Sequence, residues 1–212
     1  YNDTLSYSIG KDLAKNFEKN ELDSIISIDL LAKGMFDYYN NDSALMTEKD
    51  VQDFLGDYMM KKRKEEQEKR LAENKIKFKD VLESGENYLK ENAEKEGVQI
   101  TESGLQYRII KEGKGKKPHQ TDRVKVHYEG KLVDGTVFDS SYEKDKPSEF
   151  AVMQVIKGWS EGLLLMSEGS TFEFVIPYEL AYGERGKGQI KPFSTLIFKV
   201  ELIEVIHPNA VK

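Results

Sequence analysis

The chain has 212 residues and a net charge of −6, and charged side chains make up 33% of it. A negative chain with no isolated basic cluster is not expected to bind nucleic acid, because phosphate binding needs a concentrated positive surface. The absence of cysteine excludes disulfides and thiolate chemistry, and no apolar run reaches the ~18 residues of a membrane span. The chain begins at Tyr1 without an initiator Met, as expected of a processed product.

The first helical region is predicted by apolar stripes. One stripe repeats every four residues, at Leu5, Ile9, Leu13 and Phe17. A second runs over residues 28–39, and a polar break follows at residues 40–43. Two short amphipathic helices make a small core, so their apolar faces need a partner. Dimerisation through residues 1–60 is the economical hypothesis, and folding back on the third helix of the same chain is the alternative.

A longer helix is expected after the polar break. Thr47 lies three residues before Asp50, which is typical of a capping box. From Glu48 the helical pattern is predicted to run to about Lys95, with Gly85 as a weak point. Residues 61–70 contain no apolar side chain, so this stretch should be a solvent-exposed helix that connects two parts of the chain. We therefore expect a helical dimerisation domain over 1–60, a long connecting helix over 61–96 and a separate domain over 97–212.

The rest of the chain differs in its content of proline and glycine. Residues 1–96 contain no proline and four glycines, and all five prolines and the other twelve glycines follow. Apolar residues alternate with period two over 105–109, 124–128, 172–176 and 196–202, which predicts strands with one buried face. Asp134-Gly135 indicates a hairpin, and residues 159–168 are the one helix-like stretch. The fold class is therefore α+β.

Conventional catalytic motifs are not found. The three histidines, at positions 119, 127 and 207, are scattered, and the glycine-rich residues 183–188 open no helix. Aromatic side chains are instead concentrated in the C-terminal domain, at Tyr128, Phe138, Phe150, Trp159, Tyr182, Phe193 and Phe198. Patterning alone favours core packing for this set. Asp139 beside Phe138, and the loop position of Tyr182, favour binding instead.

Five blocks resemble the signature of FKBP-type peptidyl-prolyl cis-trans isomerases. They occur in the family's order, at residues 126–130, 134–141, 155–162, 176–183 and 190–202. Residues 97–107 resemble the entry to this domain in bacterial two-domain members, and residues 6–10 and 34–37 resemble their N-terminal helices. The resemblance implies an antiparallel half-barrel sheet wrapped on one short helix, preceded by an all-α dimerisation domain with a long connecting helix.

The resemblance also implies a function. We expect a peptidyl-prolyl cis-trans isomerase with chaperone activity, which acts as a homodimer on unfolded or proline-containing polypeptides. It implies macrolide inhibitors, no cofactor and no metal. The implied location is the periplasm or cell envelope of a Gram-negative bacterium, with the cytoplasm as the alternative. A catalytically idle FKBP-fold binding or chaperone module is the competing interpretation.

The resemblance assigns roles residue by residue. The implied catalytic residues are Asp139, Tyr182, Phe138 and Trp159. The implied substrate-binding residues are Tyr128, Phe150, Val155, Ile156, Phe193 and Phe198. The rim departs from the family pattern and is more polar, at Lys144, Ser148, Gln189 and Lys191. Inhibitor affinity and the preferred residue before proline depend on this rim.

Overall fold

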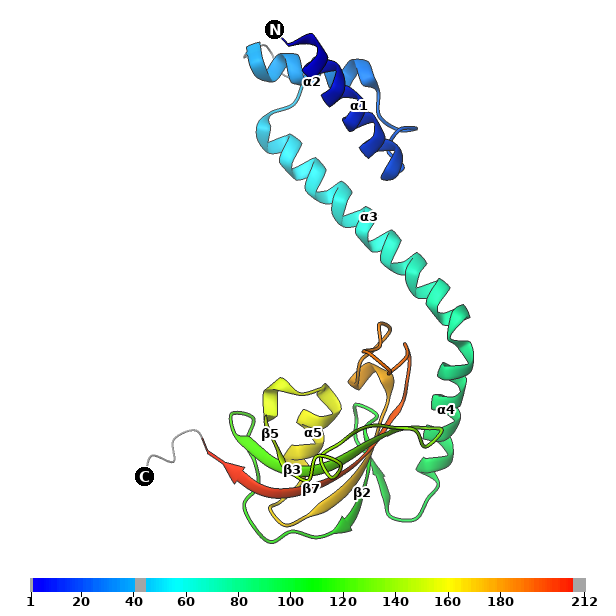
Figure 1. The fold of residues 1–212 in the computed structure, drawn as a ribbon, viewed down its shortest axis with the longest axis vertical. Coiled ribbons are helices and arrows are strands. Elements are labelled where there is room, and N and C mark those ends of the chain that lie inside the picture. The colour runs from blue at the N-terminus through cyan, green and yellow to red at the C-terminus, as the bar shows by residue number, and fades with distance from the viewer. Residues whose placement is uncertain (1, 41–44, 208–212) are drawn as a thin grey trace. The chain divides into compact units, whose positions relative to one another are not determined.

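The computed structural model describes residues 2–40 and 45–207, so most of the predicted polar break lies outside the described residues. The chain divides into two compact units, one up to Lys64 and one from Glu65 onward. Each unit has its own architecture, and Figure 1 shows the helices of the first and the sheet of the second.

The first half of the chain is helical, as predicted. Its helices are α1 (Asp3–Lys19), α2 (Ile28–Asn40), α3 (Glu48–Lys77) and α4 (Lys79–Ala93). The capping box at the start of α3 is confirmed, because the Asp50 amide donates to Thr47 Oγ1 at 3.2 Å and the Thr47 amide donates to Asp50 Oδ2 at 3.3 Å.

The single helix expected from Glu48 to about Lys95 is interrupted. The break lies at Phe78, whose backbone has φ −113° and ψ 27°, and not at Gly85. Gly85 is instead buried inside α4, where an added Cβ would lie 2.6 Å from Thr195 Oγ1. The glycine therefore serves the close approach of α4 to the C-terminal domain. Asn92 completes this contact by donating to Gln106 Oε1 at 2.9 Å.

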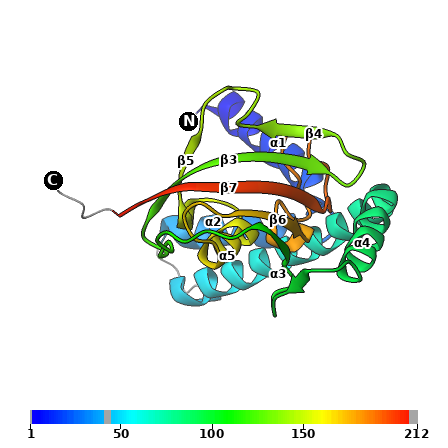
Figure 2. The same cartoon turned by 90° about the horizontal axis from the view of Figure 1, so that it is seen from below.

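The second unit contains one antiparallel sheet. Its strands are β1 (Val98–Ile100), β2 (Gln106–Lys111), β3 (Arg123–Leu132), β4 (Val137–Ser140), β5 (Ser148–Ala151), β6 (Thr171–Ile176) and β7 (Leu196–Ile206). The order is β1-β2-β6-β7-β3-β4, and β5 pairs with β3. Figure 2 shows the long strands β3 and β7 side by side. The predicted hairpin joins β3 to β4, and Gly135 takes the positive φ of 87° that this turn requires.

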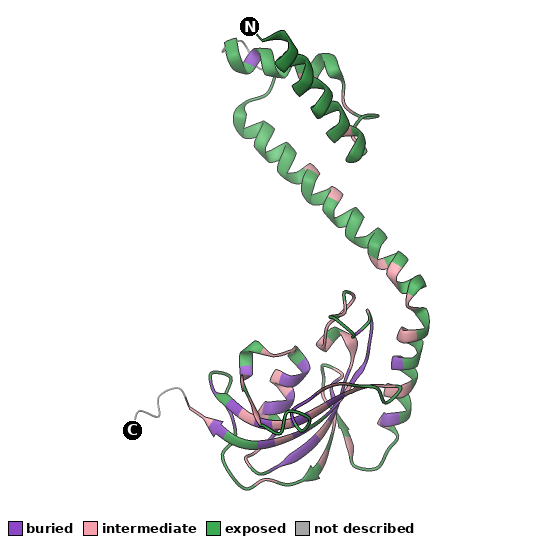
Figure 3. Cartoon of the chain, viewed as in Figure 1, coloured by how far each residue is buried: buried purple, intermediate pink, exposed green. Residues whose placement is uncertain are grey.

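Helix α5 (Lys157–Leu165) packs on this sheet. Two short 3₁₀ turns complete the domain: η1 (Val152–Gln154) shortly precedes α5, and η2 (Tyr178–Leu180) follows β6. Two glycines one helical turn apart allow the contact. An added Cβ would lie 2.5 Å from Ile176 at Gly158 and 2.6 Å from Phe174 at Gly162. The buried residues gather on α5 and the sheet in Figure 3, which confirms the predicted α+β core.

Candidate functional site

Five aromatic rings from five different elements meet beside α5. They are Tyr128 of β3, Phe138 of β4, Phe150 of β5, Trp159 of α5 and Phe198 of β7, and we call them the aromatic site. Trp159 is central to it. Its ring lies 5.2 Å from Tyr128, 5.4 Å from Phe150 and 5.2 Å from Phe198, edge-on in each pair. Edge-on rings at this separation are favourable.

Strand register and one glycine bring the outer rings together. β3 and β7 pair so that Gly130 lies opposite Phe198. An added Cβ on Gly130 would come within 2.6 Å of Phe198 and 2.8 Å of Phe138. The missing side chain therefore admits both rings, which lie 5.5 Å apart. Gly130 is a site-forming residue that the sequence marked only as part of a motif.

The aromatic site has a buried floor and a more open edge. Tyr128, Trp159 and Phe198 are each 4% exposed. Phe138, Phe150, Val155 and Ile156 are only partly buried and pack against the same core. Five of the implied site residues thus contact one another as rings, and Val155 and Ile156 pack against the same core from the segment that leads into α5.

Hydrogen-bond donors without partners lie in and around this cluster. Trp159 Nε1 is buried and has no acceptor among the described residues. Among the described residues, the Ile156 amide donates to no backbone acceptor. The Tyr182 side chain is partly exposed and makes no hydrogen bond to any described residue. An unpaired buried donor costs about 1–3 kcal/mol. A bound peptide offers carbonyl oxygens, which are acceptors of the kind that these groups lack.

A short polar chain runs along the edge of the site. The Tyr128 hydroxyl donates to Asp139 Oδ2 at 2.5 Å, and Lys144 Nζ donates to Asp139 Oδ1 at 2.8 Å. Burial alone would raise the pKa of Asp139, but the hydrogen bonds from Lys144 and Tyr128 outweigh it and lower the pKa below its usual value. Asp139 is therefore a carboxylate at neutral pH.

The pKa values of the two tyrosines near Asp139 are shifted upward, opposite to that of Asp139. Burial raises the pKa of Tyr128, and its hydrogen bond to Asp139 raises that pKa further. Burial, followed by the negative charge of Asp139, raises the pKa of Tyr182. Both hydroxyls therefore stay protonated at neutral pH. The site holds one anion and two neutral hydroxyl donors, an arrangement suited to holding a polar amide and not to nucleophilic attack.

Phe193 is the implied site residue that the structure places elsewhere. It has no exposed surface, and its ring packs edge-on against Tyr178 at 5.2 Å. Its backbone takes a positive φ of 64°, which is rare for a large side chain. A fully buried side chain cannot touch a substrate, so Phe193 belongs to the packing of its own loop.

A separate cavity of about 410 Å³ lies within the same unit. It is lined by α4, by the β1–β2 connection and by the segment between β6 and β7, at Leu82, Glu86, Leu89, Ser103, Pro177, Tyr178, Glu179 and Thr195. None of the aromatic-site residues lines it. Its wall combines apolar side chains with two carboxylates, but it has a single aromatic ring, Tyr178, whereas five rings meet at the aromatic site, so the aromatic site is the better candidate for binding a proline ring.

Two histidines that are far apart in the sequence meet in the fold. His119 and His207 both hydrogen-bond to Asp122, although they are scattered in the sequence. They are 88 positions apart along the chain, and only the pairing of β3 with β7 brings them together. His127 stands apart, with its Nδ1 3.0 Å from Ser141 Oγ.

Comparisons with known proteins match both halves of the chain. Residues 114–203 match the family described as FKBP-type peptidyl-prolyl cis-trans isomerase, and residues 2–109 match the domain amino terminal to it. The chain is 47% identical to the outer membrane protein MIP of Legionella longbeachae, over 96% of this chain and 85% of that protein. It is 43% identical to the isomerase FkpA of Aeromonas hydrophila, over 97% and 75%.

A solved structure is similar over nearly the whole chain. The crystal structure of FkpA from Escherichia coli is similar with a TM-score of 0.62 and 33% identity, over 96% of this chain and 93% of that one. The match covers the helical first half as well as the sheet. No described helix is long and apolar enough to cross a membrane.

Proposed function

The chain belongs to the FKBP-type peptidyl-prolyl cis-trans isomerases, and from this membership we propose that it catalyses the cis-trans isomerisation of X-Pro bonds at the aromatic site. The isomerase activity follows from the family. The residues that perform it are the proposal. The observation that carries it is the ring of Tyr128, Phe150 and Phe198 around Trp159, with a polar edge at Asp139.

The reaction needs no nucleophile. An X-Pro bond has a rotation barrier of about 18–20 kcal/mol because twisting removes amide resonance. Water hydrogen-bonded to the carbonyl oxygen favours the planar, charge-separated amide. A dry aromatic surface removes that water, and catalysis results if the surface binds the twisted amide more tightly than either planar form.

Each residue has a role in this scheme. The proline ring lies on Trp159, with Tyr128, Phe138, Phe150, Val155 and Phe198 as walls. The Ile156 amide and the Tyr182 hydroxyl donate to carbonyl oxygens of the substrate, and both lack the corresponding partner within the described chain. Asp139, held ionised by Lys144 and Tyr128, orients the twisting amide through its charge.

The residue assignment is tested by an exchange assay on a short Ala-Xaa-Pro-Phe peptide. The double variant Trp159→Leu with Asp139→Ala should lower kcat/KM at least about tenfold, because it removes both the floor and the edge charge. Tyr107→Leu is the matched control, since it removes a ring of the same sheet, stacked on Phe172 outside the aromatic site. We expect that control to stay within about twofold of the wild type.

Two results would contradict different parts of the proposal. An active wild type with an equally active double variant would place the chemistry elsewhere in the domain. A wild type no faster than the double variant, both near the uncatalysed rate, would favour a catalytically idle binding or chaperone module. Inhibition by a macrolide such as rapamycin, lost in the double variant, would further support the aromatic site.

We also propose that two copies associate through the N-terminal helices. Among the described residues up to Lys64, only Asp37 is buried. The apolar stripe of α1 is exposed, with Leu5 at 56% and Ile9 at 51%, and Phe54 and Leu55 of α3 are exposed at 63% and 51%. Apolar faces this open are typical of association surfaces. A second copy is the economical partner because it offers the same faces.

The dimer is tested by light scattering on the full chain and on fragment 65–212. That fragment keeps α4, which packs on the C-terminal domain through Asn92 and Gln106. We expect twice the chain mass for the full protein and the single-chain mass for the fragment. A monomeric full-length protein would contradict the proposal. The expected division into 1–60, 61–96 and 97–212 predicts the same loss for fragment 97–212.

The clients and the compartment are proposed from the relatives. The MIP relative is named an outer membrane protein, and the relatives come from Gram-negative bacteria. We place this chain in the periplasm or cell envelope, where it assists unfolded or proline-containing polypeptides. A refolding assay on a proline-limited protein tests the client class. The full chain should accelerate refolding more than fragment 65–212 at equal site concentration.

A further inference from the structure

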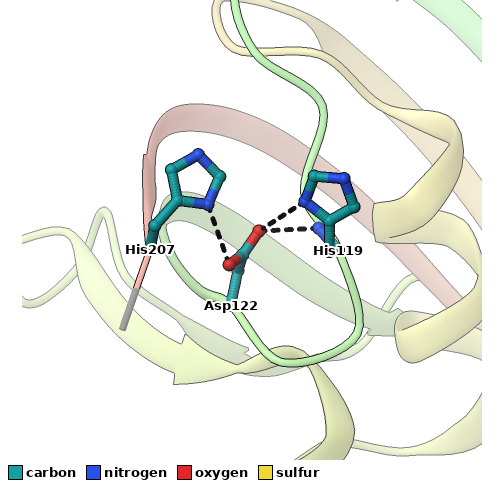
Figure 4. Close-up of side chains that lie close together, drawn as sticks. All are labelled: His119, Asp122 and His207. Carbon is teal, nitrogen blue, oxygen red and sulfur yellow. Dashed lines mark hydrogen bonds and ion pairs between the residues drawn. The ribbon is translucent and has the colours of Figure 1, made fainter. Parts of the chain in front are cut away.

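A histidine-carboxylate cluster lies outside the aromatic site. It consists of His119, Asp122 and His207, whose ligand-type atoms all lie within 4.8 Å of one another. Figure 4 shows both rings turned toward the Asp122 carboxylate. His207 Nδ1 lies 2.9 Å from Asp122 Oδ1, and His119 Nδ1 lies 3.3 Å from Asp122 Oδ2. None of these residues takes part in the isomerase scheme.

The backbone holds the cluster in place. Asp122 directly precedes β3 and His207 directly follows β7, and the neighbouring residues Arg123 and Ile206 are paired in the sheet. The His119 amide donates to Asp122 Oδ2 at 2.7 Å, and the Asp122 amide donates to the His119 carbonyl at 3.1 Å. The Asp122 carbonyl accepts from the Val152 amide at 3.0 Å. The carboxylate is thus preorganised before any ligand arrives.

The burial of the three side chains differs in a way that suits a metal. Asp122 is 3% exposed, whereas His207 is 35% exposed and His119 is 78% exposed. A fixed carboxylate with two accessible imidazoles leaves a path from solvent. The carboxylate also keeps an amide hydrogen bond on Oδ2, and such support commonly orients a metal ligand.

The spacing of the three side chains is close to that required by a small transition-metal ion. Zinc binds imidazole nitrogen and carboxylate oxygen at about 2.0–2.2 Å, so two tetrahedral ligand atoms lie about 3.3–3.6 Å apart. The observed N···O separation is 3.3 Å for His119 and 2.9 Å for His207, so the first matches this spacing and the second must widen slightly to admit the ion. Imidazole with carboxylate favours Zn²⁺ and its neighbours, whereas Mg²⁺ and Ca²⁺ favour oxygen alone. With no cysteine in the chain, no thiolate site competes for the metal.

We propose that His119, Asp122 and His207 bind one Zn²⁺ ion per chain, with water in the remaining position. The bound ion ties the start of β3 to the end of β7. It is a stabilising site and not a part of the isomerisation. The competing interpretation is that the two imidazoles merely donate hydrogen bonds to Asp122, in which case the cluster has no preference for zinc.

The test is isothermal titration of the full chain with ZnCl₂, with the His119→Ala and His207→Ala variants and their double. The wild type should bind one equivalent. Each single variant should bind at least about tenfold more weakly, and the double should lose the site. Asp122 is left intact, because its removal would leave the His119 amide unpaired. Millimolar Mg²⁺ should not displace the zinc.

The third histidine provides the matched control. His127 is hydrogen-bonded to Ser141 and stacked on Tyr142, away from the cluster, so His127→Gln should bind zinc within about twofold of the wild type. Zinc should also raise the unfolding temperature of the wild type and of His127→Gln, and not that of the double variant. A wild type that binds no zinc would overturn the proposal. So would a double variant that binds as the wild type does, or an equal loss in His127→Gln.

Discussion

Phe174 and Leu163 in the unit from Glu65 onward have no exposed surface, whereas Phe54 and Tyr39 in the unit up to Lys64 are 63% and 78% exposed. Both regions carry regular apolar periodicity. The apolar side chains of the sheet are buried against α5 within one chain, whereas α1 has no buried residue. Similar hydrophobic patterning therefore has two outcomes, a closed core in one region and an exposed apolar face in the other, for which we propose a second copy as the partner.

The largest expected difference comes from truncating one phenylalanine in each region. Phe174→Ala should destabilise the C-terminal unit by about 3–5 kcal/mol, independently of protein concentration, because it opens a cavity in a closed core. Phe54→Ala should act through association instead, so its effect should grow as the protein is diluted. Denaturant unfolding at two protein concentrations measures both. A concentration-independent effect of Phe54→Ala would contradict the dimer.

Two glycine-to-alanine substitutions, one in each region, should change the free energy of unfolding in opposite directions. Gly162→Ala should cost about 1–3 kcal/mol, because its Cβ would lie 2.6 Å from the Phe174 ring. Gly56→Ala has nothing within 4 Å in its own chain and should stabilise its helix by about 1 kcal/mol. Thermal unfolding compares the two. A destabilising Gly56→Ala would mean that a partner's backbone approaches α3 at this point.

A pair of asparagines sharpens the comparison for polar contacts. Asn92 is 4% exposed and donates to Gln106, so Asn92→Ala should cost about 1.5 kcal/mol through the buried amide left unpaired. Asn16 donates to the Asp12 carbonyl on the exposed surface of α1, and Asn16→Ala should change stability by less than about 0.5 kcal/mol. Equal losses in denaturant unfolding would show that α1 is covered at Asn16.

The smallest effect is expected at the ion pair of the aromatic site. The folded-state pKa of Asp139 lies below its usual value, so its ionised form adds stability above that value, and the stability is lost as the pH falls through the folded-state pKa. Lys144→Met should raise this pKa and flatten the pH dependence below about pH 4. The pair is exposed, so the change should stay below about 1 kcal/mol.

A carboxyl-carbon NMR titration of Asp139 measures this shift directly. Lys146→Met is the control, because Lys146 is an exposed lysine of the same loop with no ion pair to Asp139. An unchanged pKa in Lys144→Met would show that the Tyr128 hydroxyl alone holds the carboxylate. An equal shift in both variants would indicate a general charge effect of the loop.

Local patterns determined most of the secondary structure and most of the candidate site. The four-residue stripes predicted α1 and α2, and alternation predicted the strands, because both periods are set by backbone geometry. The motif blocks identified Trp159 and its neighbours. One helix was predicted from Glu48 to about Lys95 with Gly85 as its weak point, but the interruption lies at Phe78. A glycine that serves a close packing contact cannot be told from a weak point of a helix without the neighbour that it contacts.

What the sequence by itself determined is the set of elements, the family and the concentration of aromatic residues around Trp159. Only the tertiary structure decided which of them meet. Phe193 reads like its aromatic neighbours, yet its loop turns it onto Tyr178. His119 and His207 read as unrelated, yet strand pairing places both on Asp122. Contacts between distant residues depend on strand register, and register is a property of the folded sheet.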